Sequence, residues 1–174
     1  MKSLAPLLAV AVVCFASADV RAEAAPPYAV SGIVSGKVQM VGFRAMILRQ
    51  AIAFNLVGYA KNLENQTVEF VLQGDQKRID QAIKIIQQGT DKSSDVMVKT
   101  SKAKPDENLS TFTVIAWTST TRMITTPYDL VFTVRKDDSK ISEKDANKAY
   151  HQILVDTLKG DDLKKVNELS LIHI

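Results

Sequence analysis

Cysteine and histidine are scarce in this sequence, and their scarcity removes several kinds of site from consideration. The 174 residues include one cysteine, Cys14, and two histidines, His151 and His173. Cys14 lies in a segment that we expect to be removed, so the remaining chain would have no disulfide, cysteine nucleophile or thiolate metal site. Two histidines are too few for an obvious zinc cluster or for a Ser-His-Asp triad of the usual kind. Any chemistry in this chain therefore has to work without these groups.

Glycine and proline are also infrequent, and neither sign of charge dominates. With seven Gly, five Pro and 46% hydrophobic residues, the composition is typical of a domain that buries a core. The formal net charge is only +3, and Lys and Arg are scattered among Asp and Glu. A nucleic-acid-binding protein usually concentrates basic residues on one face and adds aromatic residues that stack on bases. We therefore expect no nucleic-acid partner.

The N-terminal segment differs in composition from the rest of the chain. Lys2 precedes an apolar run from Leu4 to Ala18, and the sequences Ala16-Ser17-Ala18 and Val20-Arg21-Ala22 offer small-x-Ala cleavage sites. The run is too short and too rich in alanine for a comfortable membrane span. We predict that residues 1–22 are a signal peptide, and that the protein is periplasmic or secreted without a stable membrane anchor. An uncleaved anchor is the alternative.

The hydrophobic periodicity of residues 28–117 predicts an α+β fold. Two stretches have apolar residues at helical spacing, namely residues 44–55 and the segment that begins at Gly74-Asp75 and ends at Gly89. Five stretches have the pattern of strands: residues 28–35, 56–61, 67–73, 96–100 and 111–117. The order strand, helix, strand, strand, helix, strand is the split βαβ pattern of a ferredoxin-like sandwich. We expect an antiparallel sheet with both helices on one face.

A C-terminal extension with one strand and one helix follows Thr118. Residues 128–135 alternate as a strand does, and Ser142 has the position of a helix N-cap. An apolar helical stripe then runs from Ala146 to Leu158, and Gly160 is expected to end the helix as its C-cap. These two elements cannot fold alone, so their apolar faces should dock onto the first domain or onto a protein partner.

The predicted organisation therefore has three parts. Residues 1–22 form the signal peptide, residues 28–118 form the βαββαβ domain, and residues 119–174 form the extension. We expect the extension to affect stability more than chemistry, because the domain should be complete without it.

One loop has the features of an anion-binding site. The segment Gly36-Lys37-Val38-Gln39-Met40-Val41-Gly42-Phe43-Arg44 lies between a predicted strand and the start of a predicted helix. A loop bracketed by glycines can turn backbone N–H groups inward, and the helix N-terminus adds donors and a favourable dipole. Arg44 adds a planar fork that suits phosphate oxygens. Without further support, the same residues also fit a plain strand-to-helix turn with a surface arginine.

These residues resemble the acylphosphatase family, whose signature is a Gly-x-Val-Gln-Gly-Val-x-Phe-Arg loop. The resemblance continues in register, because residues 56–62 are similar to the Gly-Trp-Val-x-Asn strand end of the family. Thr67-Val68-Glu69 and Gln73-Gly74 match the strand and turn that follow. The agreement covers residues 30–89, and a family domain would extend to about Trp117.

The resemblance implies hydrolysis of the carboxyl–phosphate bond of a small acyl phosphate, which gives a carboxylate and inorganic phosphate. It implies that Asn62 orients the attacking water. It also implies that phosphate is bound by Arg44 together with the loop amides of Gln39, Met40, Val41, Gly42 and Phe43. The family uses no metal and no cofactor, so none is expected here. Met40 stands where the family usually has glycine, and it would be strained if this position required a positive φ.

The sequence leaves a second function open. The same fold and loop could serve as a non-catalytic module that binds an anion or a protein in the periplasm, with the extension as the interface. Fold resemblance cannot separate the two functions. The presence of both Arg44 and Asn62 favours the hydrolase. Met40, the extension and the expected compartment favour the module, because acyl phosphates are mainly intracellular metabolites.

Overall fold

The computed structural model describes residues 27–170. The predicted signal peptide, with Cys14, lies outside the described residues, as does His173. Export therefore stays a prediction. None of the helices formed by residues 27–170 is long and apolar enough to cross a membrane.

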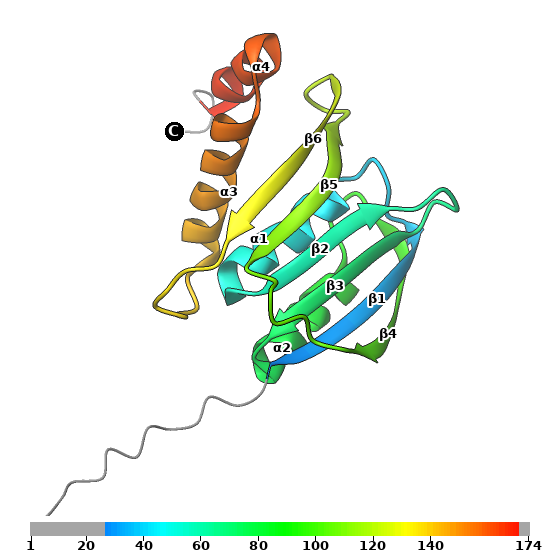
Figure 1. Cartoon of the computed structure of the whole chain (residues 1–174). Helices are drawn as coiled ribbons and strands as arrows, with labels where there is room; N and C mark the ends of the chain where they lie inside the picture. The colour runs from blue at the N-terminus through cyan, green and yellow to red at the C-terminus, as the bar shows by residue number, and fades with distance from the viewer. Residues whose placement is uncertain (1–26, 171–174) are drawn as a thin grey trace, which may run out of the picture.

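A six-stranded sheet forms one layer of the molecule and helices form the other (Figure 1). The strands lie in the order β4-β1-β3-β2-β5-β6 across the sheet. Their bounds are β1 (Tyr28–Lys37), β2 (Val57–Asn62), β3 (Val68–Gly74), β4 (Ser94–Ala103), β5 (Thr111–Ser119) and β6 (Ile124–Thr133). The helices are α1 (Phe43–Phe54), α2 (Gln76–Gln88), α3 (Glu143–Thr157) and α4 (Gly160–Ser170).

The predicted βαββαβ arrangement is confirmed, with one addition. Strands β4, β1, β3 and β2 are antiparallel neighbours, as expected. The pair β2 and β5 is parallel, so the sheet as a whole is mixed. The chain reverses between β4 and β5, so β5 runs opposite to β4 and in the same direction as β2. The Gln73 side chain of β3 holds the segment between β4 and β5 in place. Its Nε2 donates to the Asp106 carbonyl at 2.8 Å, and its Oε1 accepts from the Asp106 amide at 2.7 Å.

Helix α1 is the central helix of the second layer. It packs against α2 on one flank and α3 on another, and it also covers β2 and β5. Most of its residues are therefore buried, including Ile47, Leu48, Ala51 and Ile52, all of which are fully inaccessible. Helix α2 lies at the margin of the layer and buries only Ile79, Ala82 and Ile86.

The extension docks onto the first domain, which was one of the two predicted outcomes. Strand β6 pairs with β5, and α3 packs against α1 and β6. The predicted cap is present, since Ser142 Oγ accepts a hydrogen bond of 3.1 Å from the Asp145 amide. The predicted stripe is buried at Ala146, Tyr150, Leu154 and Leu158. The extension thus completes the same hydrophobic core as the rest of the domain.

The prediction that Gly160 ends the helix is wrong. Helix α3 ends at Thr157 with Leu158 as its C-cap, and Gly160 is the first residue of α4. Gly160 has a left-handed φ of 57°, which glycine adopts without steric cost. The chain turns there, so that Val166 of α4 is also buried in the core.

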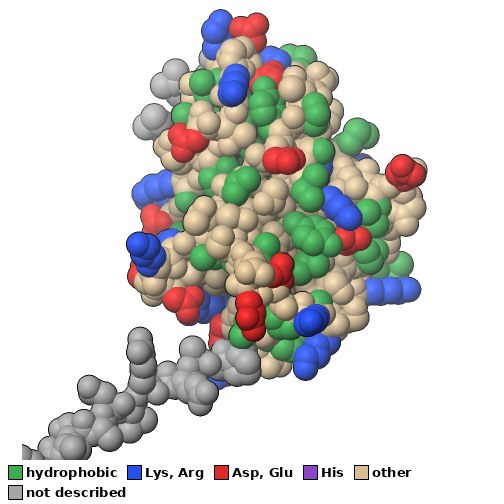
Figure 2. Space-filling view, viewed as in Figure 1, with side chains coloured by type: hydrophobic (Ala, Val, Ile, Leu, Met, Phe, Trp, Pro, Cys, Tyr) green, Lys and Arg blue, Asp and Glu red, His purple; other side chains and the backbone are tan. Residues whose placement is uncertain are grey.

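The outer face of the sheet, opposite the helices, is open to solvent (Figure 2). Large apolar residues such as Ile33, Met97 and Val131 are exposed on the strands. In this view hydrophobic side chains lie among polar ones, and Lys and Arg are scattered over the face rather than gathered in one patch.

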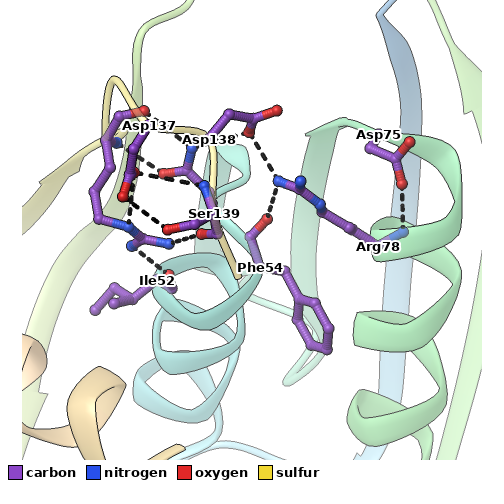
Figure 3. Close-up of polar contacts among 9 residues, drawn as sticks. Ile52, Phe54, Asp75, Arg78, Asp137, Asp138 and Ser139 are labelled. Carbon is purple, nitrogen blue, oxygen red and sulfur yellow. Dashed lines mark hydrogen bonds and ion pairs between the residues drawn. The ribbon is translucent and has the colours of Figure 1, made fainter. Parts of the chain in front are cut away.

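The loop between β6 and α3 covers the C-terminal end of α1 (Figure 3). Arg135 Nη1 donates to the Ile52 carbonyl at 2.8 Å, and the Ile141 amide donates to the Ala53 carbonyl at 2.9 Å. The last carbonyls of a helix have no partner within the helix. Here the extension supplies partners for two of them.

Asn55, directly after α1, joins this loop to the helix end. Its Oδ1 accepts a 2.8 Å hydrogen bond from the Arg135 amide, and its Nδ2 donates to the Arg135 carbonyl and to Asp138 Oδ1, each at 3.1 Å. Asp138 also forms an ion pair of 2.8 Å with Arg78 of α2 (Figure 3). Asn55 is buried and takes a left-handed φ of 55°, which asparagine tolerates better than most residues.

We predict that Asn55→Ala lowers the free energy of unfolding by about 2–4 kcal/mol. The change leaves buried groups without partners, at about 1–3 kcal/mol, and places a Cβ in a left-handed conformation without the local hydrogen bonds of asparagine, at about 1 kcal/mol. Asn55→Gly removes only the hydrogen bonds, so it should cost about 1 kcal/mol less. Urea denaturation of both variants measures the difference. Equal losses would show that the backbone conformation contributes nothing, and a loss below about 0.5 kcal/mol for alanine would contradict the role of this contact.

Candidate functional site

A cavity of about 390 Å³ lies between the β1–α1 loop, the end of β2 and the β5–β6 turn. It brings together nearly all the site residues predicted from the sequence. Those that line it are Met40, Val41, Gly42, Phe43, Arg44 and Asn62. Gln39 is the exception among the predicted residues. Its side-chain Nε2 donates to the carbonyls of Leu63 and Thr67, at 2.8 and 2.9 Å. Gln39 therefore fastens the loop to the β2–β3 turn.

The N-terminus of α1 opens onto this cavity without a cap. Gly42 is the N-cap residue, no side chain caps the helix, and its first turn contains no acidic residue. By contrast, the N-termini of α2 and α3 are capped by Asp75 and Ser142. The first helical hydrogen bond of α1 joins the Met46 amide to the Gly42 carbonyl. The amides that precede it are those that an anion can cap, and the helix dipole favours negative charge at the same place.

The Arg44 guanidinium is held by one nitrogen and presents the others. Its Nη1 donates to the carbonyls of Ile115 and Ala116, at 2.7 and 2.8 Å. Its Nε and Nη2 donate to no other residue within the described part of the chain, and no carboxylate there forms an ion pair with Arg44. Burial lowers the pKa of Arg44 from its ordinary value. An arginine nevertheless stays charged at neutral pH. The side chain thus offers a positive fork of donors that an anion can occupy.

The carbonyls that hold Arg44 belong to a bulge in β5. Pairing between β5 and β6 shifts register between Val114 and Trp117, and Ala116 takes a left-handed φ of 51°. Such a conformation costs about 1–2 kcal/mol for a residue with a Cβ. The Ala116 amide donates to Asp129 Oδ1 of β6 at 2.8 Å. The extension thus provides a hydrogen-bond acceptor for the bulge amide, and Arg44 provides a donor for the bulge carbonyls.

The same bulge leaves room beside Asn62. The parallel pairing of β2 with β5 ends at Ala60 and Val114, two residues before Asn62. Asn62 Oδ1 is buried and makes no hydrogen bond to any described residue. Buried polar atoms in proteins nearly always have a partner, which can be a bound water. Asn62 therefore lines the cavity with a side chain whose oxygen is an unused acceptor.

Comparison with known proteins agrees with this geometry. The sequence model of the acylphosphatase family matches residues 30–114. An acylphosphatase of Chlorobaculum tepidum is 41% identical over 83 residues, which are 48% of this chain and 90% of that protein. The chain belongs to the acylphosphatase family. An acylphosphatase of Caldivirga maquilingensis is 38% identical over 82 residues, covering 47% of this chain and 83% of the relative. The structure of an acylphosphatase from Coxiella burnetii has a TM-score of 0.46 at 29% identity, over 51% of this chain and 92% of that one.

The acylphosphatase-family domain of this chain shares its cavity with the extension. Residues 119–121, Arg122 and Tyr150 of the extension line it together with the predicted residues and with Trp117 and Thr118 at the end of the domain. The expectation that the extension affects stability more than chemistry stays a prediction, but the extension does reach the cavity. The family resemblance covered residues 30–89, so it gave no sign of this contribution. The run of four hydroxyl-bearing residues before Arg122, which spans the end of β5 and the turn that follows, was the available signal.

The cavity is electropositive. Its basic side chains are Arg44, Arg49, Lys92 and Arg122, and its one acidic side chain is Asp91. None of these basic residues forms an ion pair with another described residue. No group of three or more His, Cys, Asp and Glu residues that could hold a metal ion occurs in residues 27–170.

Met40 does occupy a left-handed position in the acylphosphatase loop, with a φ of 57°. Its side chain is 82% exposed, so it gains little from packing.

We predict that Met40→Gly, which restores the residue usual in the family, raises the free energy of unfolding by about 0.5–1 kcal/mol. The relieved strain is about 1–2 kcal/mol, and the greater freedom of glycine in the unfolded chain offsets about half of it. Urea denaturation measures the gain. Met40→Ala is the matched control, because it shortens the side chain but keeps the Cβ, and an equal gain for alanine would show that strain is not the cause.

Proposed function

We propose that this protein hydrolyses the carboxyl–phosphate bond of small acyl phosphates. One observation carries the proposal: the uncapped N-terminus of α1, the donors of Arg44 and the unpaired oxygen of Asn62 line a single cavity. The first two features suit a phosphoryl group, and the third suits a water molecule. Family membership supports the same reaction class.

In the proposed reaction, the phosphoryl group sits at the helix N-terminus. The amides of Val41, Gly42 and Phe43 and the Nε and Nη2 groups of Arg44 donate to its oxygens. These donors are in place before the substrate binds, because the bulge carbonyls of β5 orient Arg44. Preorganised donors stabilise the charge that develops on the phosphoryl oxygens during transfer without reorganisation in the reaction itself.

Asn62 Oδ1 accepts a hydrogen bond from the attacking water and aims the water oxygen at phosphorus. The new bond forms between that oxygen and phosphorus, and the bond between phosphorus and the acyl oxygen breaks. The electron pair of the broken bond leaves with the carboxylate, and the water proton goes to a phosphate oxygen. A carboxylate is a stable anion, so its departure needs no general acid. The products are a carboxylate and inorganic phosphate, and the enzyme forms no covalent intermediate.

The proposal also covers where the protein acts. The signal peptide predicted for residues 1–22 would place the hydrolase in the periplasm or outside the cell. The alternative is a non-catalytic anion-binding module, which the strained Met40 in the loop favours. Turnover separates the two functions, because both bind phosphate and only the hydrolase consumes an acyl phosphate.

Arg44 is the first test of this mechanism. Lysine keeps the charge and can still donate to the bulge carbonyls, but it has no planar fork left for the phosphoryl group. We expect Arg44→Lys to fold and to bind phosphate weakly, yet to lose most of the turnover of benzoyl phosphate. Arg44→Ala should lose phosphate binding as well, and its turnover should fall by about a thousandfold.

The measurements are phosphate titration by calorimetry and hydrolysis of benzoyl phosphate, with circular dichroism as the control for folding. A wild type that binds phosphate no better than Arg44→Ala would contradict the anion site. A wild type that binds phosphate and hydrolyses nothing would support the binding module instead.

Asn62 is the second test. Asn62→Ala should lower turnover by about a hundredfold and leave phosphate affinity nearly unchanged, because the residue orients water and does not hold the phosphoryl group. Steady-state kinetics and calorimetry on the same preparation separate the two effects. Unchanged turnover in a folded Asn62→Ala protein would rule out the assigned role.

A further inference from the structure

The extension contributes a basic residue, Arg122, to the acylphosphatase cavity. Arg122 lies in the turn between β5 and β6, and its amide donates to Ser119 Oγ at 3.3 Å. The turn is also held from α4, because Lys165 Nζ donates to the Met123 carbonyl at 2.9 Å. The position of Arg122 is thus fixed by parts of the chain that lie beyond residues 30–114, where the family model matches.

Arg122 is in the cavity wall together with Arg49 and Tyr150. The Arg49 guanidinium lies 5.8 Å from the centroid of the Tyr150 ring. Burial raises the pKa of the Tyr150 hydroxyl, while the nearby charges of Arg122 and Arg49 act in the opposite direction. Arg122 and Arg49 therefore lie near one aromatic side chain of α3, in the cavity that Arg44 also lines.

Neither of these arginines has an anionic partner in residues 27–170. Arg122 Nε is also buried without any hydrogen-bond partner there. Leaving such a donor unused is costly unless a ligand or water occupies it. Arg44 and the loop amides provide enough donors for one phosphoryl group. The additional positive charge of Arg122 and Arg49 therefore suits a second negative group.

We propose that Arg122 and Arg49 form a second anion position, and that the preferred substrates are acyl phosphates whose acyl group carries a carboxylate. The proposal rests on the proposed function, because it assigns the phosphoryl group to Arg44 and the acyl group to the side of the cavity built by the extension. The cavity volume of about 390 Å³ lies in the range of pockets that enclose whole small molecules. A dicarboxylic acid activated on one carboxyl group has the required two anionic ends.

The test uses stable phosphonates, so that binding is measured without turnover. Calorimetry compares a carboxyalkyl phosphonate with the alkyl phosphonate of the same chain length, for phosphonoacetate, 3-phosphonopropionate and 4-phosphonobutyrate. We expect at least one carboxylate-bearing member to bind the wild type about tenfold more tightly than its alkyl counterpart, since a charged hydrogen bond is gained. The advantage should shrink as salt is added.

Arg122→Gln should reduce this ratio of dissociation constants to about one. Arg122→Met is a second variant that keeps the apolar stem, in case glutamine disturbs the turn. The matched control is Lys77→Gln, which removes one positive charge from the exposed start of α2, and it should keep the wild-type ratio. A wild-type ratio near one at every chain length would overturn the proposal. So would a ratio that survives in both folded Arg122 variants.

The outcome is separable from that of the proposed function. Hydrolysis of benzoyl phosphate without a preference for carboxylates would overturn only the second anion position. A clear preference for carboxylates in a protein that hydrolyses no acyl phosphate would support the second position and overturn the hydrolase.

Discussion

The two hydrogen bonds from Arg44 Nη1 to the carbonyls of Ile115 and Ala116 set the geometry on which the site depends. A long, charged side chain at the start of a helix would otherwise sample many rotamers, and its ordering would have to be supplied by the substrate. Here the bulge supplies that order in advance. Because carbonyls and not a carboxylate hold the guanidinium, its positive charge stays available to an anion.

The bulge also joins the site to the extension. It ends the pairing of β5 with β2 just before Asn62, and it persists in a left-handed conformation because Asp129 of β6 binds the Ala116 amide. The extension in turn caps α1 through Arg135, which is also hydrogen-bonded to Asn55 at the helix end, and it covers α1 with α3. The helix that presents its N-terminus to the cavity therefore has its other end fastened by residues that the family domain lacks. The contacts between the extension and α1 or the bulge therefore both stabilise the fold and position the site.

Local pattern was enough to predict much of this molecule. The spacing of apolar residues predicted both helices of the domain and the order of its strands and helices along the chain, and the loop before Arg44 pointed to the candidate anion site. The bulge could not be predicted, because it arises from contacts between Arg44, Ala116 and Asp129, which are far apart in the sequence. The same holds for Arg122, whose position in the cavity depends on how the extension docks. Gly160 was misjudged because a glycine can end one helix or start the turn into the next, and only the burial of Val166 decides between them.

The docking of β6 also changes which strand is left at the margin of the sheet. An unpaired strand edge offers a row of N–H and C=O groups to any other chain, and this leads to edge-to-edge aggregation. Strand β6 takes over the edge that β5 would otherwise present, and it carries Pro127, which has no N–H to offer. The opposite edge, β4, carries the exposed residues Lys99 and Lys102. Both margins of the sheet are thus unsuited to recruiting a second copy.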